Sequence, residues 1–239
     1  MNLGRPPKEV AFQTALGRML CGKAEDVLRL RFTRRLAGKF QLIFTSPPFP
    51  LNNKKRYGNK TGEDYLEWLA EFAPLLVEYL APRGSIVIEL GNAWERGSPT
   101  MSTLAVEALL EFKRRGELHL CQEFVWHNPA RLPTPAQWVN VERIRVKDSF
   151  TRLWWMSPTE RPKADNRKVL QEYSDAMRQL LRTRRYNAGR RPSEHSVGAT
   201  SFFKDHGGSI PSNVIAVANT DSKSCYHSYC REHEIELLT

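Results

Sequence analysis

The chain has 239 residues, of which 41% are hydrophobic and 26% charged, a composition ordinary for a soluble globular protein of one large domain or two small ones. No stretch approaches the roughly 18 uninterrupted apolar residues of a membrane span. Residues 1–8 lack the apolar core of a secretory signal. Four cysteines in a chain of this length do not make a disulfide framework, so we expect reduced thiols, a cytoplasmic protein and no membrane partner.

The apolar pattern alternates between strand-like runs and helical repeats up to residue 156. In the first predicted long helix, Thr61 and Asp64 have the spacing of a capping box. The order strand–helix–strand–helix–strand predicts an α/β fold with a doubly wound sheet, whose last two strands pair antiparallel at its edge. The predicted elements are, in chain order, a short strand at 19–22, a helical stretch at 24–30, a buried strand at 41–45, a helix at 61–80, a buried strand at 85–90, a helix at 103–115 and strands at 119–127 and 150–156.

Beyond Pro158 the chain becomes basic and only weakly periodic, with one predicted helix at 174–183 and a turn at 207–211. The formal net charge is +10, and between residues 161 and 191 ten Lys and Arg face three acidic residues. Such a block favours a polyanionic partner, because each neutralised phosphate releases a condensed counterion. A solvated surface carries the same charge equally well, so charge alone leaves both interpretations open.

The predicted strand at 41–45 leads directly into Ser46-Pro47-Pro48-Phe49, at the edge of the sheet where α/β proteins bind ligands. Prolines have no N–H group, so this turn offers carbonyl and hydroxyl oxygens but few donors. Oxygen acceptors beside the ring of Phe49 suit a planar group that carries an amine, such as a nucleobase. An ordinary proline turn, or a Pro-x-x-Pro ligand from Pro47 to Pro50, explains the same residues.

Four collinear stretches resemble the β-group DNA amino-methyltransferases, in particular the cytosine-N4 branch of the PvuII type. The resemblance implies a Rossmann-like methyltransferase fold with a basic target-recognition region. The stretches are Thr-Ser-Pro-Pro-Phe at 45–49 with 53–59, Trp-His-Asn-Pro at 126–129 with Arg-Leu-Pro at 131–133, residues 138–148 with Leu-Trp-Trp at 153–155, and Gly-Gly-Ser-Ile-Pro-Ser-Asn at 207–213.

The resemblance implies methyl transfer from S-adenosylmethionine to the exocyclic amine of a cytosine extruded from double-stranded DNA. Ser46, Pro47, Pro48 and Phe49 are the implied catalytic residues. Oxygens of Ser46 and Pro47 would accept hydrogen bonds from the amine and make its nitrogen more nucleophilic, while Phe49 stacks on the base. Alternation places the cations at 143, 145 and 147 on one face if that stretch is extended. The candidate DNA contacts are Asn52, Lys54, Lys55, Arg56, Arg143, Arg145, Lys147, Arg190, Arg191 and His195.

Members of this family continue into a strand that ends in Phe-x-Gly-x-Gly and cradles S-adenosylmethionine, but the 239 residues contain no Gly-x-Gly. The resemblance therefore implies an incomplete sheet, with a catalytic half at 1–157, a DNA target-recognition region at 158–212 and a truncated start of the cofactor-binding half at 213–239. The cofactor-binding residues stay unknown. A second polypeptide supplies the missing half, or the chain is an inactive DNA-binding remnant or specificity component. An adenine-N6 enzyme of the same fold is a further alternative.

Three smaller features have structural explanations. The spacing of Cys225, Cys230 and the neighbouring histidines at 227 and 233 matches no structural zinc pattern, so we expect no metal. We expect Trp154 and Trp155 to be core residues at the edge of the sheet. Gly91-Asn92 either lines the active-site edge or forms a plain turn.

Overall fold

A computed structural model describes residues 10–49, 60–186 and 200–218, together with residues 189, 190, 192–194, 196–198, 228 and 232. The chain divides into two compact units, Met1–Lys163 with Val214–Thr239, and Ala164–Asn213. The second unit begins and ends within a few residues of the basic region expected at 158–212. Its role in target recognition stays a prediction.

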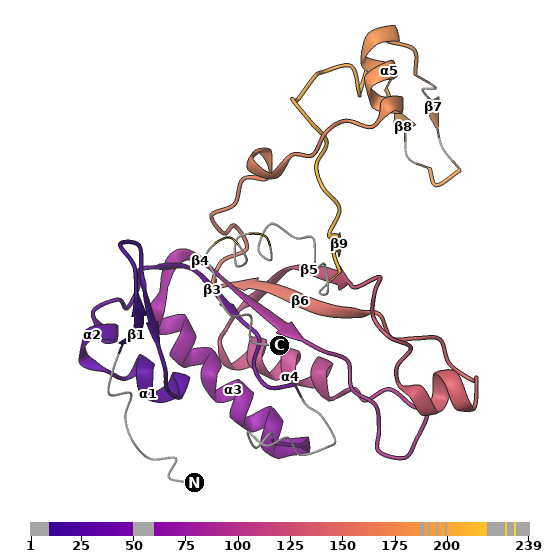
Figure 1. Cartoon of the computed structure of the whole chain (residues 1–239). Helices are drawn as coiled ribbons and strands as arrows, with labels where there is room; N and C mark the ends of the chain where they lie inside the picture. The colour runs from indigo at the N-terminus through magenta and orange to yellow at the C-terminus, as the bar shows by residue number, and fades with distance from the viewer. Residues whose placement is uncertain are drawn as a thin grey trace. The chain divides into compact units, whose positions relative to one another are not determined.

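Among the described residues, the first unit is built on a mixed sheet of five strands with the order β3-β4-β6-β5-β9 (Figure 1). Strand β3 runs parallel to β4, and β6 is antiparallel to both β4 and β5. The predicted antiparallel pairing of β5 with β6 is confirmed, but its place at the edge is wrong, because β6 also pairs with β4 and lies at the centre. The strands are β3 (Phe40–Thr45), β4 (Leu80–Leu90), β5 (His119–His127), β6 (Phe150–Ser157) and β9 (Val214–Ala216).

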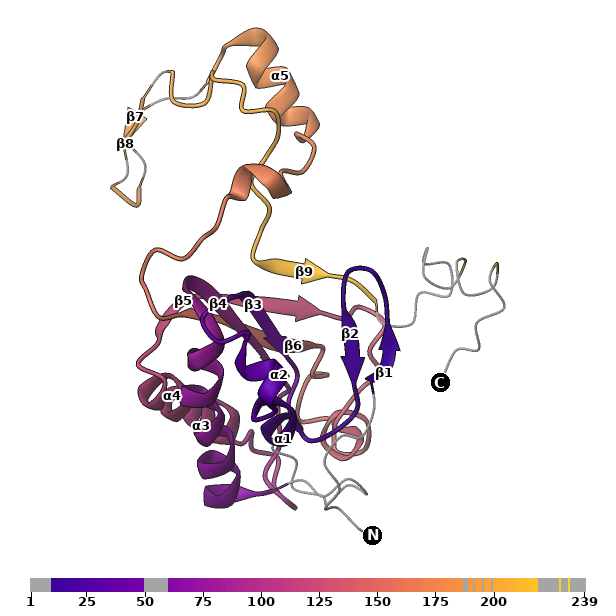
Figure 2. The same ribbon diagram turned by 90° about the vertical axis from the view of Figure 1, so that its left-hand side faces the viewer.

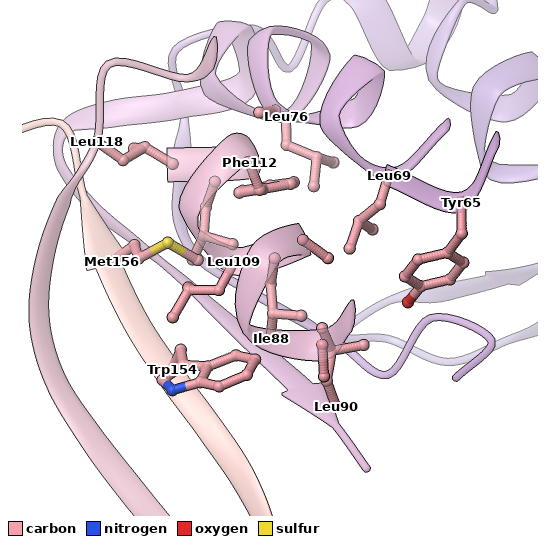
Figure 3. Close-up of a cluster of buried hydrophobic side chains, with 14 of the residues drawn as sticks. Tyr65, Leu69, Leu76, Ile88, Leu90, Leu109, Phe112, Leu118, Trp154 and Met156 are labelled. Atoms are coloured by element: carbon pink, nitrogen blue, oxygen red, sulfur yellow. The ribbon is translucent and has the colours of Figure 1, made fainter. Parts of the chain in front are cut away.

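Helices α3 (Gly62–Tyr79) and α4 (Leu104–Arg115) pack against each other along one face of this sheet (Figures 1 and 2). Because side chains alternate along a strand, every second residue of β4 points to these helices. The hydrophobic core between them is continuous across the two layers (Figure 3). Its buried members include Tyr65, Leu69, Ile86, Ile88, Leu90, Leu109, Phe112, Trp154 and Met156.

The two helices are also joined at their surface by charged side chains. Arg115 of α4 pairs with Glu67 of α3 and with Glu111 one turn earlier. Hydrogen bonds from Arg114, the larger contribution, and from Arg115 lower the pKa of the Glu111 carboxyl to about 2. These pairs are exposed, so we expect their contribution to stability to be small and sensitive to salt.

The ends of the predicted helices are only partly confirmed. Helix α4 ends at Gly116, as predicted. Thr61 stands at the N-cap of α3, but its side chain makes no capping hydrogen bond, so the predicted capping box is wrong. Strand β4 begins at Leu80, five residues before the strand predicted at 85–90. Gly84 lets this added part of the strand approach β3, since a Cβ there would lie 2.6 Å from the Phe40 carbonyl oxygen.

Strand β3 was expected to be buried, and this expectation is wrong. It pairs with β4 on one side only, so within the described residues it forms the edge of the sheet. Leu42 and Phe44, which alternate with Ile43 and Thr45, are 58% and 59% exposed. An edge strand that presents large apolar side chains is a surface suited to a further protein segment.

The N-terminal elements lie beside β3 and α3 (Figure 2). The helical stretch predicted at 24–30 contains the short helix α1, and a second short helix that was not predicted, α2, follows after Leu30, which is extended. The Thr33 hydroxyl donates to the Val27 carbonyl at 2.6 Å and so ties the two helices together. The elements are β1 (Val10–Gln13), β2 (Arg18–Leu20), α1 (Ala24–Leu28) and α2 (Arg31–Arg34).

The second unit is small and contains helix α5, which the Ser174 side chain caps by accepting from the Met177 amide. The Tyr173 hydroxyl donates to Asp205 at 3.0 Å and fixes the turn at Gly207, whose φ is +81°. None of the described helices of either unit is long and apolar enough to cross a membrane. The elements are a 3-10 turn at Asn166–Val169, α5 (Asp175–Thr183), β7 (Gly189–Arg190) and β8 (Ser196–Val197).

Candidate active site

The loop that follows β3 borders two cavities. Ser46, Pro47 and Pro48 line a larger cavity of about 540 Å³. Phe49 lines a second, smaller cavity of about 250 Å³. The four residues predicted to be catalytic are therefore divided between these two cavities.

The larger cavity is mostly apolar. It lies between β3, α1 and α3, and Glu25 is the only charged residue among its described lining residues. The Glu25 carboxylate already accepts a hydrogen bond from the Trp68 indole at 3.4 Å. S-adenosylmethionine carries a carboxylate, which needs cationic or amide donors. No cationic side chain lines the described part of this cavity, so a carboxylate bound there would depend on backbone amide donors.

The smaller cavity combines aromatic and polar walls. Besides Phe49, it is lined by one residue from each of three neighbouring strands, Glu89 of β4, Trp126 of β5 and Thr151 of β6. Trp126 is paired with Thr151 across β5 and β6, and Glu89 alternates with the buried core residues of β4. All three side chains consequently project from the face of the sheet opposite to α3 and α4. The remaining lining residues, Asn128 and Arg131, follow β5 in the chain.

Hydrogen bonds hold the polar wall in place. The Thr151 hydroxyl donates to Glu89 Oε1 at 3.3 Å, and the Trp126 indole donates to the Val217 carbonyl at 2.9 Å. Asn128 is buried, and its side-chain oxygen accepts from the Ala130 amide at 3.1 Å. The cavity is therefore bounded by side chains whose orientations are fixed before any ligand enters.

Gly91 allows the ring of Phe49 to reach its position. A Cβ atom at Gly91 would lie 2.6 Å from two carbon atoms of that ring. The half-buried ring also packs against the core cluster while it lines the cavity. Gly91 therefore lies directly beside the Phe49 ring, while a place for Gly91-Asn92 at an active-site edge stays a prediction. That Phe49 stacks on a base stays a prediction.

Asn92 connects the end of β4 to the segment between β5 and β6. Its amide nitrogen donates to Asp148 at 2.8 Å, and its oxygen accepts from Arg152 at 2.6 Å. Arg152 also pairs with Glu123 at 3.2 Å, and Glu123 accepts from the Trp154 indole at 3.1 Å. This network fixes the segment that carries Asn128 and Arg131. Trp154 is core, as predicted, but at the centre of the sheet.

The three cations at 143, 145 and 147 do not form the predicted row, because their segment is not an extended strand. Arg143 has a positive φ of 57°, which breaks the alternation. Arg145 donates to the Pro99 carbonyl at 3.0 Å, and Lys147 donates to the Arg131 carbonyl at 3.3 Å. The alternating face is thus wrong, while contact of these residues with DNA stays a prediction.

Among the described residues no group of three or more His, Cys, Asp and Glu side chains could hold a metal ion.

Several residues predicted to belong to a site cannot be placed in the structure. Arg190 is described only as part of the backbone of β7. Asn52, Lys54, Lys55, Arg56, Arg191, His195, Cys225 and Cys230 lie outside the described residues.

Sequence reasoning missed the polar wall of the smaller cavity. Glu89 carried a usable signal, since it is the one carboxylate in the apolar run Ser85–Leu90. Trp126, Asn128 and Arg131 lay within a matched stretch but had no role assigned. Thr151 carried no signal at all, because its place depends on the register of β6 against β5.

The chain belongs to the DNA methylase family, whose N6_N4_Mtase model matches residues 40–233. Among its relatives, the type II methyltransferase M.PvuII of Proteus hauseri is 38% identical over 233 residues, which are 97% of this chain and 67% of that protein. The solved PvuII DNA methyltransferase (cytosine-N4-specific) superposes with a TM-score of 0.57 and 32% identity, covering 84% of this chain. This chain spans 58% of the length of that solved relative. The predicted family and Rossmann-like methyltransferase fold are confirmed.

Proposed function

We propose that this chain carries the base-binding and DNA-recognition part of a site-specific DNA methyltransferase. The reaction is transfer of a methyl group from S-adenosylmethionine to the exocyclic N4 amine of cytosine in duplex DNA, in a restriction–modification system. The observation that carries the proposal is the Ser-Pro-Pro-Phe loop at the carboxyl end of β3, beside a cavity with aromatic and polar walls. The similarity to a cytosine-N4-specific enzyme supports the choice of base.

The smaller cavity suits a single planar ring. Its volume of about 250 Å³ is below the range of roughly 300–1,000 Å³ that drug-sized ligands occupy. A base must leave the duplex before it can enter, at a cost of a few kcal/mol that contacts within the pocket offset. Phe49 and Trp126 supply the aromatic surfaces for such contacts.

The oxygens around the loop would activate the amine. Its nitrogen is a poor nucleophile because the lone pair is delocalised into the ring. As methyl transfer places positive charge on this nitrogen, its hydrogen bonds to nearby acceptors become stronger, which favours transfer. Ser46 Oγ and the Pro47 carbonyl are the proposed acceptors in the loop; because both residues line the larger cavity, the proposal requires the amine to point from the smaller cavity toward this loop. The Glu89 carboxylate, in the cavity of Phe49, is a further acceptor and is placed to take the proton that the methylated nitrogen releases.

Duplex DNA is the proposed partner of the basic side chains. Cations that contact phosphates make the affinity for DNA fall as salt is added. Each such contact adds about −0.9 to the slope of the logarithm of the binding constant against the logarithm of the salt concentration. The proposed contacts are Asn52, Lys54, Lys55, Arg56, Arg143, Arg145, Lys147, Arg190, Arg191 and His195.

The methyl donor requires a further protein segment, which is part of the proposal. The edge of β3, with exposed Leu42 and Phe44, is the surface on which such a segment would add strands. A second polypeptide that supplies the cofactor-binding half is the partner proposed for this edge. We place the assembled enzyme in the cytoplasm, bound to DNA.

Expression in a host without DNA methylation tests the function. The chain is produced alone and joined to the part of M.PvuII that it does not match, and host DNA is digested to nucleosides for mass analysis. We expect N4-methylcytosine from the joined protein, and its loss in a Phe49→Ala variant. N6-methyladenine in its place would refute the choice of base, and no methylated nucleoside from the folded joined protein would refute the function.

A further inference from the structure

Two opposite charges line the smaller cavity without pairing with each other. Glu89 accepts from the Thr151 hydroxyl at 3.3 Å, while Arg131 Nη1 donates to the Phe150 carbonyl at 3.4 Å. Within the described part of the chain, no ion pair joins the carboxylate to the guanidinium, although both face the same 250 Å³ space. A ligand in this cavity therefore meets an acceptor at one place and a cationic donor at another.

Arg131 has hydrogen-bonding capacity to spare. A guanidinium carries five N–H donors in a planar fork, and the single bond to Phe150 is long. The residue is half-buried, so water satisfies its other donors less fully than at an open surface. A ligand with two adjacent acceptors would bind to two parallel N–H groups of this fork.

The backbone of Arg131 is fixed at both of its polar groups. Its amide donates to the Asn128 carbonyl at 3.2 Å, and its carbonyl accepts from Lys147 Nζ at 3.3 Å. Asn128 is itself buried, and its backbone N–H donates to the Ser149 carbonyl at 2.8 Å. The fork is therefore presented to the cavity from an anchored position, which reduces the entropy lost on binding.

Cytosine matches this arrangement of charges. Its edge presents the N4 amine, then the acceptors N3 and O2 in a row, whereas adenine presents its N6 amine, the single acceptor N1 and a C–H group. Given the proposed function, we propose that Arg131 determines the base: its guanidinium donates two parallel N–H bonds to N3 and O2 of the extruded cytosine, while Glu89 lies toward the amine. Adenine satisfies only one of these two donors, so the cavity discriminates against it.

Binding of nucleosides to the whole chain tests the proposed role of Arg131 without requiring methyl transfer. The indole N–H signal of Trp126, assigned with a Trp126→Phe variant, reports on the cavity by NMR. The probes are 2′-deoxycytidine, 3-deaza-2′-deoxycytidine, which has C–H in place of N3, and 2′-deoxyadenosine. Arg131→Met removes the fork, and Arg131→Lys keeps the charge but cannot form the parallel pair. Arg96→Met, an exposed residue outside the cavity, is the matched control.

For the unaltered chain we expect deoxycytidine to bind about tenfold more tightly than either other probe, within the range of a good bidentate contact. Arg131→Met should abolish this preference, Arg131→Lys should keep part of it, and Arg96→Met should leave it unchanged. Equal loss of affinity for deoxycytidine and its 3-deaza analogue in both Arg131 variants would overturn the inference and leave the proposed function standing. Failure of every nucleoside to shift the Trp126 signal would instead overturn both.

Discussion

Substitution of Gly91 by Ala tests how the ring of Phe49 is held at the cavity. A Cβ atom at this position would lie 2.6 Å from Cδ2 and Cε2 of Phe49 and 3.3 Å from Cγ. Non-bonded carbon atoms pack at about 3.5–4.0 Å, so the ring must move by about 1 Å or the strand must bend. The ring packs against the core cluster and also lines the cavity, so a move away from Gly91 loses core contacts or takes up cavity space.

Overpacking of this kind costs about 1–3 kcal/mol of unfolding free energy. Urea unfolding of Gly91→Ala should show this loss, and deoxycytidine should bind more weakly because the ring has moved. Gly17→Ala is the matched control, since a Cβ there meets nothing within 4 Å. The double variant Gly91→Ala/Phe49→Leu, with a smaller side chain beside the new methyl group, should recover part of the stability.

The reasoning would be refuted if Gly91→Ala matched Gly17→Ala in unfolding free energy and bound deoxycytidine as tightly as the unaltered chain. The space beside Gly91 would then be larger than the structure shows, and Phe49 would not be fixed by this contact.

Three further predictions concern the framework around the site. Leu42→Ala should change the unfolding free energy by less than about 0.5 kcal/mol because this side chain is exposed at the sheet edge, whereas the same substitution at buried Leu69 should cost about 2–5 kcal/mol; equal costs in urea unfolding would show that β3 is covered. Ser174→Ala should cost α5 about 1 kcal/mol and speed hydrogen exchange in its first turn, while Thr61→Ala, which removes no capping bond, should leave α3 nearly unchanged. The pKa of Glu111 is lowered from 4.5 to about 2, so the stability from its two arginine partners is present above pH 4.5 and lost as the pH falls toward 2. Unfolding of Glu111→Gln should therefore be easier than that of the unaltered chain at pH 7, with the difference fading in that window, and a difference independent of pH would contradict the assignment.

Local patterns in the sequence predicted the elements whose signals are local. The bounds of β5 match the predicted 119–127, and α4 ends at the glycine that the pattern indicated. Predictions that depended on neighbouring elements were less successful. The apolar residues of β3 predicted a buried strand. A hydrophobic run does not show whether a second strand pairs with its free side, so it could not reveal that β3 lies at the edge. Strand β4 was expected to begin only at residue 85, because Pro82 and Gly84 do not reveal the pairing of its first residues with β3.

The candidate site shows the same limit more clearly. The loop at 45–49 is contiguous, so its residue types alone indicated an acceptor-rich turn beside an aromatic ring. The polar wall comes from three strands and the following segment, and only the register of β6 against β5 and β4 brings Thr151 and Trp126 to the cavity of Glu89. Without that register, a carboxylate in an apolar run and an arginine 42 positions later have no evident connection.

Photocrosslinking tests most directly the central claim that the cavity of Phe49 receives an extruded cytosine. A pool of duplexes with 5-iododeoxycytidine at varied positions is bound to the chain, irradiated and digested, and the modified residues are located by mass spectrometry. The structure predicts that the iodinated base is attached to Phe49 or Trp126, and that unlabelled deoxycytidine reduces the yield. Attachment only to residues outside this cavity, with no effect of deoxycytidine, would contradict the claim.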